Sequence, residues 1–274
     1  MVKKKVIRVI KEDNNFQHFE VIKRNRNKRY KHRKFFVEGV RNIKEAIRNG
    51  WDISSFLYSR EKRLSDWARE ILDNVNTDTL YELSQNLMDK LSGKEDTSEL
   101  LAIVKMKEDS FSRIKLDKNP LIVVIDRPSN RGNLGTLIRS CDSLNCNGLI
   151  MTGHAVDLFD PKTIISSVGT IFSLPTLRLS SYKEVYNWIQ DLKEHYLDLQ
   201  VVGTSASGDK AINQCDFSKP TILLLGNETV GLNRNYKDIC DVMTEIPIDG
   251  VASSLNVSCA ASIMLYEIKR QRYL

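Results

Sequence analysis

The sequence predicts two α/β domains, the second of which contains a parallel sheet with helices on both faces. Short apolar segments alternate with longer amphipathic segments along most of the chain, as strands and helices do in α/β proteins. Several short segments, such as "LIVVID" and "TILLLG", are apolar throughout, which is typical of strands buried on both faces of a sheet. A chain of 274 residues is long enough for two domains of ordinary size.

Positive charge is concentrated in the first part of the chain. Residues 1–60 contain 17 Lys or Arg and 6 Asp or Glu, so they carry +11 while the remaining residues sum to −5. The segment 23–34, "KRNRNKRYKHRK", has eight basic residues, no acidic residue and two interleaved rings, Tyr30 and His32. This pattern favours contact with RNA or DNA. We expect residues 1–34 to form a basic arm whose RNA-binding residues are Lys23, Arg24, Arg26, Lys28, Arg29, Lys31, Arg33 and Lys34.

Two other functions of the basic segment are weaker alternatives. A flexible arm that only improves solubility remains open, whereas a membrane-surface helix is disfavoured because no apolar stripe accompanies the charge. No apolar run is long enough to span a bilayer, and no secretory signal pattern is present. We therefore expect a cytoplasmic protein. The five cysteines form no C-x-x-C pair, which favours buried reduced thiols over disulfides or a zinc site.

Residues 35–106 predict a small α/β domain. A strand at the start of "FFVEGVRNIKEAIRNG" is followed by a helix that Gly50 ends, with apolar residues at helical spacing at Val40, Ile43, Ala46 and Ile47. Strand and helix patterns then alternate through "ISSFLYS", "LSDWAREILDNV", "DTLYEL", "SQNLMDKLSG" and "ELLAIVKM". The polar residues 107–119 predict a linker, after which Pro120 begins the second domain.

Residues 120–274 predict the parallel sheet. Its strands are expected at "LIVVID", "GLIMTG", "LPTLRL", "LQVVGTS", "TILLLG" and "VMTEIPI", with helices between them such as "SYKEVYNWIQDLKEHY". In open α/β sheets ligands bind beyond the carboxyl ends of the strands. The turns that follow the strands are therefore the places where a site is expected.

Three of these turns have an unusual polar composition. They are residues 127–139, residues 226–233 with the sequence "GNETVGLN", and residues 249–267. The first lacks both the G-x-x-x-x-G-K-[ST] frame of a P-loop and the G-x-G-x-x-G frame of a dinucleotide site. It offers amides and a guanidinium instead, groups that hydrogen-bond to oxygen atoms and pair with phosphate.

Together the turns resemble the three motifs of the SpoU-type ribose 2′-O-methyltransferases of the SPOUT superfamily. The matching segments are "NRGNLGTLIRS", "LLLGNETVGL" and "IPIDGVASSLNVSCAASIMLYE", in the order of the family. The resemblance covers the second domain, and residues 35–106 are similar to the substrate-binding domain of members acting on ribosomal RNA. It implies a C-terminal SPOUT domain with a deep trefoil knot, S-adenosyl-methionine as methyl donor and a homodimer, although topology rules alone argue against a knot.

The resemblance also implies site residues by position. Those expected to act on the substrate are Arg139, Asn133, Glu228, Ser254 and Asn256. Those expected to hold the cofactor are Gly226, Ile246 and Leu255, with Thr204 and Ser205 on a neighbouring turn. Arg131 and Cys259 depart from the commoner family residues, but neither position carries the chemistry.

A methyl sulfonium is already a good electrophile, so the enzyme's main task is to position the ribose hydroxyl, which can lower a barrier by roughly 7–11 kcal/mol. Arg139 would bind the adjacent phosphate and help to remove the proton of the ribose 2′-hydroxyl. Asn133, Asn256 and Ser254 would hydrogen-bond the ribose and the phosphate. Glu228 would orient Arg139 or the motif loops. No His or metal is required. The identity of the base stays open, because free Arg is a very poor base.

Several alternatives remain open at this point. Arg139 could extend to solvent, Asn133 and Ser254 could cap helices, and Glu228 could be an ordinary turn residue. The substrate could be transfer RNA, although members acting on it usually lack a domain like residues 35–106. A non-catalytic RNA-binding or assembly protein of the same fold is the third possibility.

Overall fold

The computed structural model describes residues 4–273 of the chain. The chain folds into two units, of which the first contains the residues up to Glu108 together with Asp157–Ser173. The second unit contains Asp109–Val156 and Leu174–Leu274. The short stretch 157–173 therefore leaves the second unit and joins the fold of the first before the chain returns.

The first unit is built on a five-stranded mixed sheet with the strand order β1-β4-β3-β5-β2. Strand β5 runs antiparallel to β2 and β3, and the other pairs are parallel. The strands are β1 (Val6–Val9), β2 (Lys34–Glu38), β3 (Ile53–Tyr58), β4 (Thr79–Leu83) and β5 (Leu100–Lys105). The helices are α1 (Asn14–Arg24), α2 (Arg26–His32), α3 (Val40–Arg48), α4 (Asp66–Asn74), α5 (Gln85–Leu91) and α7 (Pro161–Ser167), with a 3-10 turn at Thr170–Phe172. All strands and helices expected within residues 35–106 are present.

The prediction of a separate basic arm at residues 1–34 is wrong for residues 4–34, which are folded into the first unit. Strand β1 pairs with β4, and helix α1 buries Phe16, Phe19 and Ile22 in the core. These three residues recur every third position, which is a helical pattern that the high charge around them obscured. The Asp13 side chain caps α1 by accepting the backbone N–H groups of Asn15 and Phe16. Residues 1–3 of the expected arm lie outside the described residues.

The stretch 157–173 is fixed in the first unit by aromatic and polar contacts. Phe35 of β2 stacks on Phe159 with 4.3 Å between ring centroids, and the Trp51 indole N–H donates to the carbonyl of Phe172 at 2.9 Å. Asp157 is 4% exposed and pairs with the guanidinium of Arg29 from α2. Residues distant in sequence therefore complete the core of this unit.

The second unit contains a seven-stranded sheet in which every described pairing is parallel, as predicted. The strand order is β10-β12-β9-β11-β6-β7-β8. The strands are β6 (Leu121–Asp126), β7 (Gly148–Thr152), β8 (Thr176–Leu179), β9 (Gln200–Thr204), β10 (Lys210–Ala211), β11 (Thr221–Leu225) and β12 (Val242–Glu245). Only the two-residue strand β10 was not expected from the sequence, because so short a segment carries no periodic pattern.

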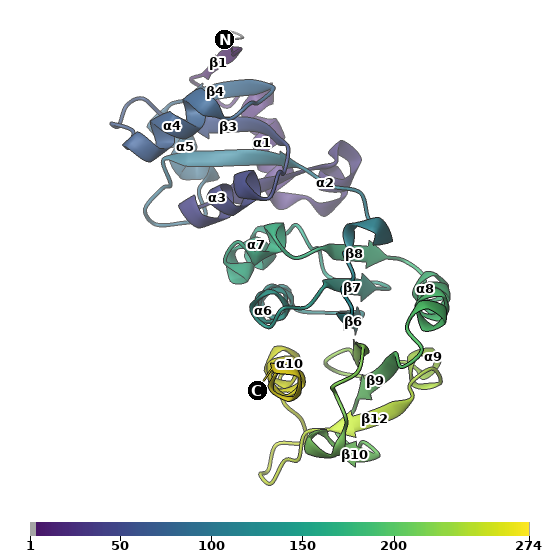
Figure 1. Ribbon diagram of the computed structural model, residues 1–274. Helices are drawn as coiled ribbons and strands as arrows, with labels where there is room; N and C mark the ends of the chain where they lie inside the picture. The colour runs from purple at the N-terminus through teal and green to yellow at the C-terminus, as the bar shows by residue number, and fades with distance from the viewer. Residues whose placement is uncertain (1–3, 274) are drawn as a thin grey trace. The chain divides into compact units, whose positions relative to one another are not determined.

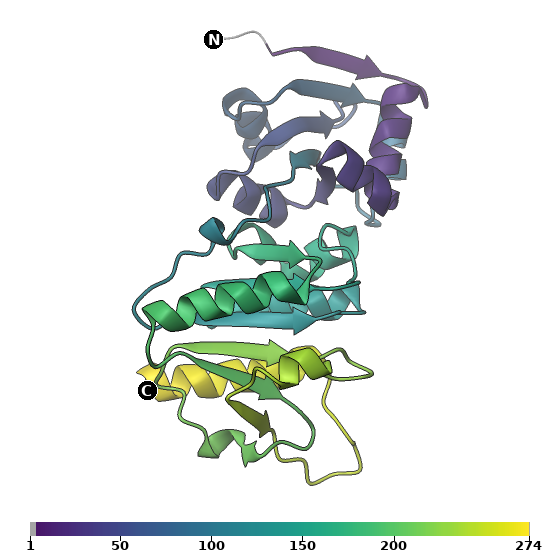
Figure 2. The ribbon, with the colours of Figure 1, turned by 90° about the vertical axis from the view of Figure 1, so that its right-hand side faces the viewer.

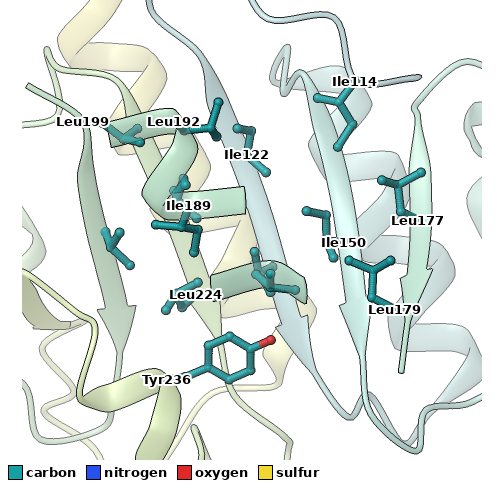
Figure 3. Packing of buried hydrophobic residues seen from close by; sticks show 14 of the residues in the cluster. Ile114, Ile122, Ile150, Leu177, Leu179, Ile189, Leu192, Leu199, Leu224 and Tyr236 are labelled. Carbon is teal, nitrogen blue, oxygen red and sulfur yellow. The ribbon is translucent and has the colours of Figure 1, made fainter. Parts of the chain in front are cut away.

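Helices cover both faces of this sheet, as predicted. Figure 1 shows α6 and α10 side by side on one face and α8 on the other, and Figure 2 shows α8 lying along the strands. The helices are α6 (Arg131–Ser143), α8 (Tyr182–His195), α9 (Arg234–Lys237) and α10 (Val257–Tyr273), with 3-10 turns at Phe111–Arg113 and Ile212–Gln214. Helix α8 packs Val185, Ile189 and Leu192 against apolar side chains of the strands, as Figure 3 shows for Ile189 and Leu192.

The segment 107–119 is a linker only in its first residues, because its later part belongs to the second unit. The Asp109 carboxylate pairs with the guanidinium of Arg178 on β8. Ile114 is 5% exposed and belongs to the core cluster under α8. A Cβ atom at Gly148 would lie 2.8 Å from Cγ1 of Ile114, so the lack of a side chain at Gly148 makes room for Ile114.

The cysteines are all unpaired, and Cys141, Cys146 and Cys215 are buried. The expectation of buried thiols is wrong for Cys259, which is exposed on α10, because an apolar helix can still present one face to solvent. Among the helices of residues 4–273, none has the length and apolar character needed to cross a membrane.

Candidate active site

A cavity of about 330 Å³ lies in the second unit, beyond the carboxyl ends of β9, β11 and β12 and beside the first turn of α10. Its volume is within the range of small-molecule sites. Most of the lining side chains are apolar, among them Leu225, Ile248 and Met264. All five residues predicted to hold the cofactor line it: Thr204, Ser205, Gly226, Ile246 and Leu255.

The loop after β11 forms one wall of the cavity and depends on glycine. Asn227 and Gly231 exchange two backbone hydrogen bonds of 3.1 and 2.9 Å, which close the loop. A Cβ atom on Gly226 would lie 2.3 Å from backbone atoms of Gly231 and Leu232. Gly231 has φ +69°, which a residue with a side chain rarely adopts. The two glycines of "GNETVG" are therefore required for this tight wall, whatever binds against it.

Asn227, which sequence reasoning missed, ties this loop to the loop after β6. Its side-chain amide donates to the carbonyl of Arg127 at 2.8 Å, and its oxygen accepts the backbone N–H groups of Thr229 and Val230. The signal available in the sequence was an Asn in a Gly-rich turn, a residue that often hydrogen-bonds backbone groups two or three positions on.

Four side chains form a hydrogen-bonded series at the edge of the cavity, which we call the polar chain: Ser129, Glu228, Asn133 and Asn256. The Ser129 hydroxyl and backbone N–H donate to Oε2 of Glu228 at 2.7 and 3.1 Å. The amide of Asn133 donates to Oε1 at 3.4 Å, and the amide of Asn256 donates to the Asn133 oxygen at 3.1 Å. The polar chain thus joins all three sequence motifs.

Burial alone would raise the pKa of the Glu228 carboxyl, but hydrogen bonds from the Ser129 side chain, from backbone N–H groups and from Asn133 outweigh it. They hold the pKa of Glu228 below its ordinary value. Glu228 is therefore an anion at neutral pH and can only accept hydrogen bonds.

The helix caps differ from those expected. Asn130, not Asn133, caps α6 by accepting the N–H groups of Gly132 and Asn133. At the start of α10, Asn256 and not Ser254 accepts the N–H and hydroxyl of Ser258, at 2.9 and 2.6 Å. Two candidate Asn residues lie within the same turn of the first motif, so sequence alone did not distinguish the cap from the site residue. Ser254 lines the cavity.

Arg139 is exposed on α6 and does not line the cavity. Within residues 4–273 its guanidinium has no hydrogen-bond or ion-pair partner, and Glu228 contacts Ser129 and Asn133 in place of it. The expectation that Glu228 orients the loops is consistent with this geometry, but the alternative that it orients Arg139 is not. Arg139 is thus available to a ligand outside the cavity.

Lys237 was not singled out from the sequence, yet it lines the cavity. Among the described lining residues, Lys237 and Glu228 are the two that carry charge. The signal in the sequence was weak, because a Lys in a polar turn after a strand is usually a solvated surface residue.

The eight predicted RNA-binding residues divide into three groups by exposure. The prediction is wrong for Arg29, which is 2% exposed and donates to Asp157 and to the carbonyls of Ile22 and Lys23. Its charge is neutralised inside the fold, so it is unavailable to phosphate.

Lys23 and Lys34 are half-buried. The Lys23 ammonium donates to the carbonyl of Leu91 at 2.6 Å, and burial lowers its pKa, while Lys34 donates to the Ser54 hydroxyl. The exposed members of the set are Arg24, Arg26, Lys28, Lys31 and Arg33.

Comparison with known protein families identifies the relationship. The model of the SpoU rRNA methylase family matches residues 120–266, and that of the SpoU L30e-like domain matches residues 13–102. This chain belongs to the SpoU rRNA methylase family. The resemblance found in the three motifs is confirmed, and the L30e-like match includes α1 and α2, in agreement with the fold of the first unit.

Two relatives are named as enzymes of 23S rRNA. The 23S rRNA (uridine(2479)-2′-O)-methyltransferase of Streptomyces viridochromogenes is 41% identical over 97% of this chain and 92% of its own length. The 23S rRNA (guanosine(2553)-2′-O)-methyltransferase RlmP of Bacillus subtilis is 26% identical over 86% of this chain and 88% of its own length. The structure of the SpoU methyltransferase AviRb from Streptomyces viridochromogenes with AdoMet has a TM-score of 0.90 and 41% identity, covering 95% of this chain and 98% of that chain.

Proposed function

We propose that this protein transfers a methyl group from S-adenosyl-methionine to a ribose 2′-hydroxyl of large-subunit ribosomal RNA in the cytoplasm. The observation that carries the proposal is the convergence of all five predicted cofactor residues on one cavity, beside a polar chain that joins the three motifs. The 41% identical relative, named as a 23S rRNA 2′-O-methyltransferase, supports the same reaction.

The cavity fits the proposed cofactor in chemistry and size. Its apolar side chains suit an adenine ring, and its hydroxyl and amide groups suit ribose and amino-acid groups. The backbone groups of Gly226, Ile246 and Leu255 are expected to hold the cofactor, with Thr204 and Ser205 at one side. The cofactor supplies an activated methyl group with a neutral leaving group when bound.

The chain's own residues then have mainly to position the ribose. Asn133, Asn256 and Ser254 are suited to hydrogen-bond the ribose and its phosphate, and Glu228 holds the amide of Asn133. Arg139, exposed and without a partner within residues 4–273, is suited to pair with the adjacent phosphate. Such a pairing would fix the 2′-hydroxyl and favour the removal of its proton.

The first unit supplies an RNA-binding surface in this proposal. The five exposed members of the predicted RNA-binding set lie on α1 and α2 or directly after α2, and they would bind phosphates without reading sequence. The L30e-like domain also supports ribosomal over transfer RNA, because members acting on transfer RNA usually lack such a domain.

A homodimer and a trefoil knot remain part of the proposal as family properties. The dimer is supported by an exposed apolar stripe on α10, where Cys259, Ile263 and Tyr266 recur at helical spacing and the last two are 42% and 56% exposed. Light scattering after gel filtration should give twice the mass of 31.4 kDa, and Ile263→Glu should return it towards the monomer. A wild-type protein with the mass of a monomer would contradict the proposed homodimer.

The proposed reaction is tested with methyl-labelled S-adenosyl-methionine and separate samples of unmodified ribosomal and transfer RNA. Nuclease digestion and mapping should find label on one ribose in large-subunit RNA. The identity to the uridine-specific relative supports a uridine there ahead of a guanosine. Label only in transfer RNA would contradict the assignment of ribosomal RNA as the substrate. Cofactor binding without methyl transfer to any RNA would favour the non-catalytic alternative.

A further inference from the structure

Ser129 begins the polar chain, although it belongs to none of the sets of residues expected from the sequence. It follows Pro128 after β6 and is itself exposed, and both of its donors reach the same oxygen of Glu228. The hydroxyl contact, 2.7 Å, is the shortest side-chain contact of Glu228, whereas the Asn133 contact is 3.4 Å. Ser129 is thus the tighter of the two side chains that hold this carboxylate.

The ionised state of Glu228 fixes the direction of the hydrogen bonds that it receives from Ser129 and Asn133. A carboxylate can only accept, so the Asn133 side chain must turn its NH₂ group towards Glu228. Its oxygen is then free to accept the NH₂ group of Asn256, and the Asn256 oxygen accepts the two donors of Ser258. The Glu228 carboxylate at one end and the Ser258 backbone N–H at the other therefore hold the two amides in one consistent orientation.

We propose that Ser129 is a positioning residue for methyl transfer, which acts by holding Glu228 so that Asn133 and Asn256 present their amides to the ribose in one orientation. This inference rests on the proposed function. Ser129 itself lies outside the residues that line the cofactor cavity, so its loss is expected to lower the rate of methyl transfer more than the affinity for the cofactor.

The test compares Ser129→Ala with Ser129→Thr, which keeps the hydroxyl, and with Ser143→Ala as a matched control. Ser143 is an exposed serine at the other end of α6. Single-turnover methylation of the RNA substrate and the Kd of S-adenosyl-methionine are measured for each protein. Ser129→Ala should slow methyl transfer about tenfold, as expected when one hydrogen bond to a charged group is lost. Its cofactor Kd should stay within about twofold, and Ser129→Thr and Ser143→Ala should retain most of the wild-type rate.

Three results would overturn the inference while leaving the reaction intact. They are a wild-type rate in Ser129→Ala, an equal loss of rate in Ser129→Ala and Ser129→Thr, and a loss of cofactor affinity that parallels the loss of rate. A wild-type protein that transfers no methyl group to any RNA would instead contradict the proposed function, so the two failures are distinguishable.

Discussion

The two regions proposed to bind ligands use their polar residues in different ways. On α1 and α2 the basic side chains are mostly exposed, and the one that is buried, Arg29, serves the fold. At the edge of the cavity, polar side chains bind one another in a series with defined donors and acceptors. The first arrangement suits affinity for a flexible polyanion, whereas the second suits the placing of one reacting group.

The largest effect should come from the residue that reaches the substrate outside the cavity. Arg139→Ala should lower methyl transfer by about 10²–10³-fold, by analogy with the loss of a single charge-stabilising donor in other enzymes. Cofactor affinity should be nearly unchanged, because Arg139 does not line the cavity. Single-turnover assays and calorimetric titration measure the two quantities.

The matched control for Arg139 is Arg234→Ala, since the Arg234 side chain is 92% exposed. If Arg139→Ala transferred methyl groups as fast as Arg234→Ala, Arg139 would have no role in methyl transfer.

Within the basic segment, Arg29 and its neighbour Lys28 should behave oppositely. Arg29→Ala leaves Asp157 buried without its partner and should cost about 3–5 kcal/mol of folding free energy. Lys28→Ala should leave stability within about 0.5 kcal/mol but weaken RNA binding and reduce the steepness of the slope of log affinity against log salt by about 0.7–0.9. Urea unfolding and salt-dependent binding test the pair.

Equal stability of the two variants would mean that the Arg29 ion pair contributes nothing to the first unit. Equal salt slopes for Lys28→Ala and the wild type would mean that this exposed residue contacts no phosphate.

A smaller effect is expected at Lys237, the one cation among the described residues that line the cavity. We expect it to face the carboxylate of the bound cofactor, so Lys237→Ala should raise the Kd of S-adenosyl-methionine about tenfold. Affinity for methylthioadenosine, which lacks the amino-acid carboxylate, should not change, and Lys237→Arg should restore most of the loss. A parallel loss for both ligands would argue against this pairing.

The smallest effect is a pH dependence at Glu228. Because its pKa is lowered in the folded protein, the carboxylate stabilises the fold above its unfolded pKa, and this contribution is lost as the pH falls through the lowered value. The difference in unfolding free energy between wild type and Glu228→Gln should therefore be constant near neutral pH and shrink in acid. A difference that does not change with pH would show that ionisation of Glu228 does not stabilise the fold.

Periodicity predicted most of the elements in both units, because continuous apolar strands and amphipathic helices leave a local pattern. It failed at α1 and at the extent of the first unit. In α1 the charged residues concealed the apolar spacing of Phe16, Phe19 and Ile22, and no local pattern indicates that residues 157–173 pack against Phe35 and Trp51. Long-range packing of this kind is decided only when the whole chain collapses.

The sequence by itself indicated the parallel sheet, the turns that carry the site and five of the residues that line its cavity, since these follow from apolar runs and from the family resemblance of motifs contiguous in the chain. Only the tertiary structure decided which polar residues are available to a ligand. It buried Arg29 against Asp157, left Arg139 exposed, and brought Ser129 within 2.7 Å of Glu228 across 99 residues of sequence. Availability depends on burial and on partners distant in sequence, and neither is encoded by a residue's neighbours in the chain.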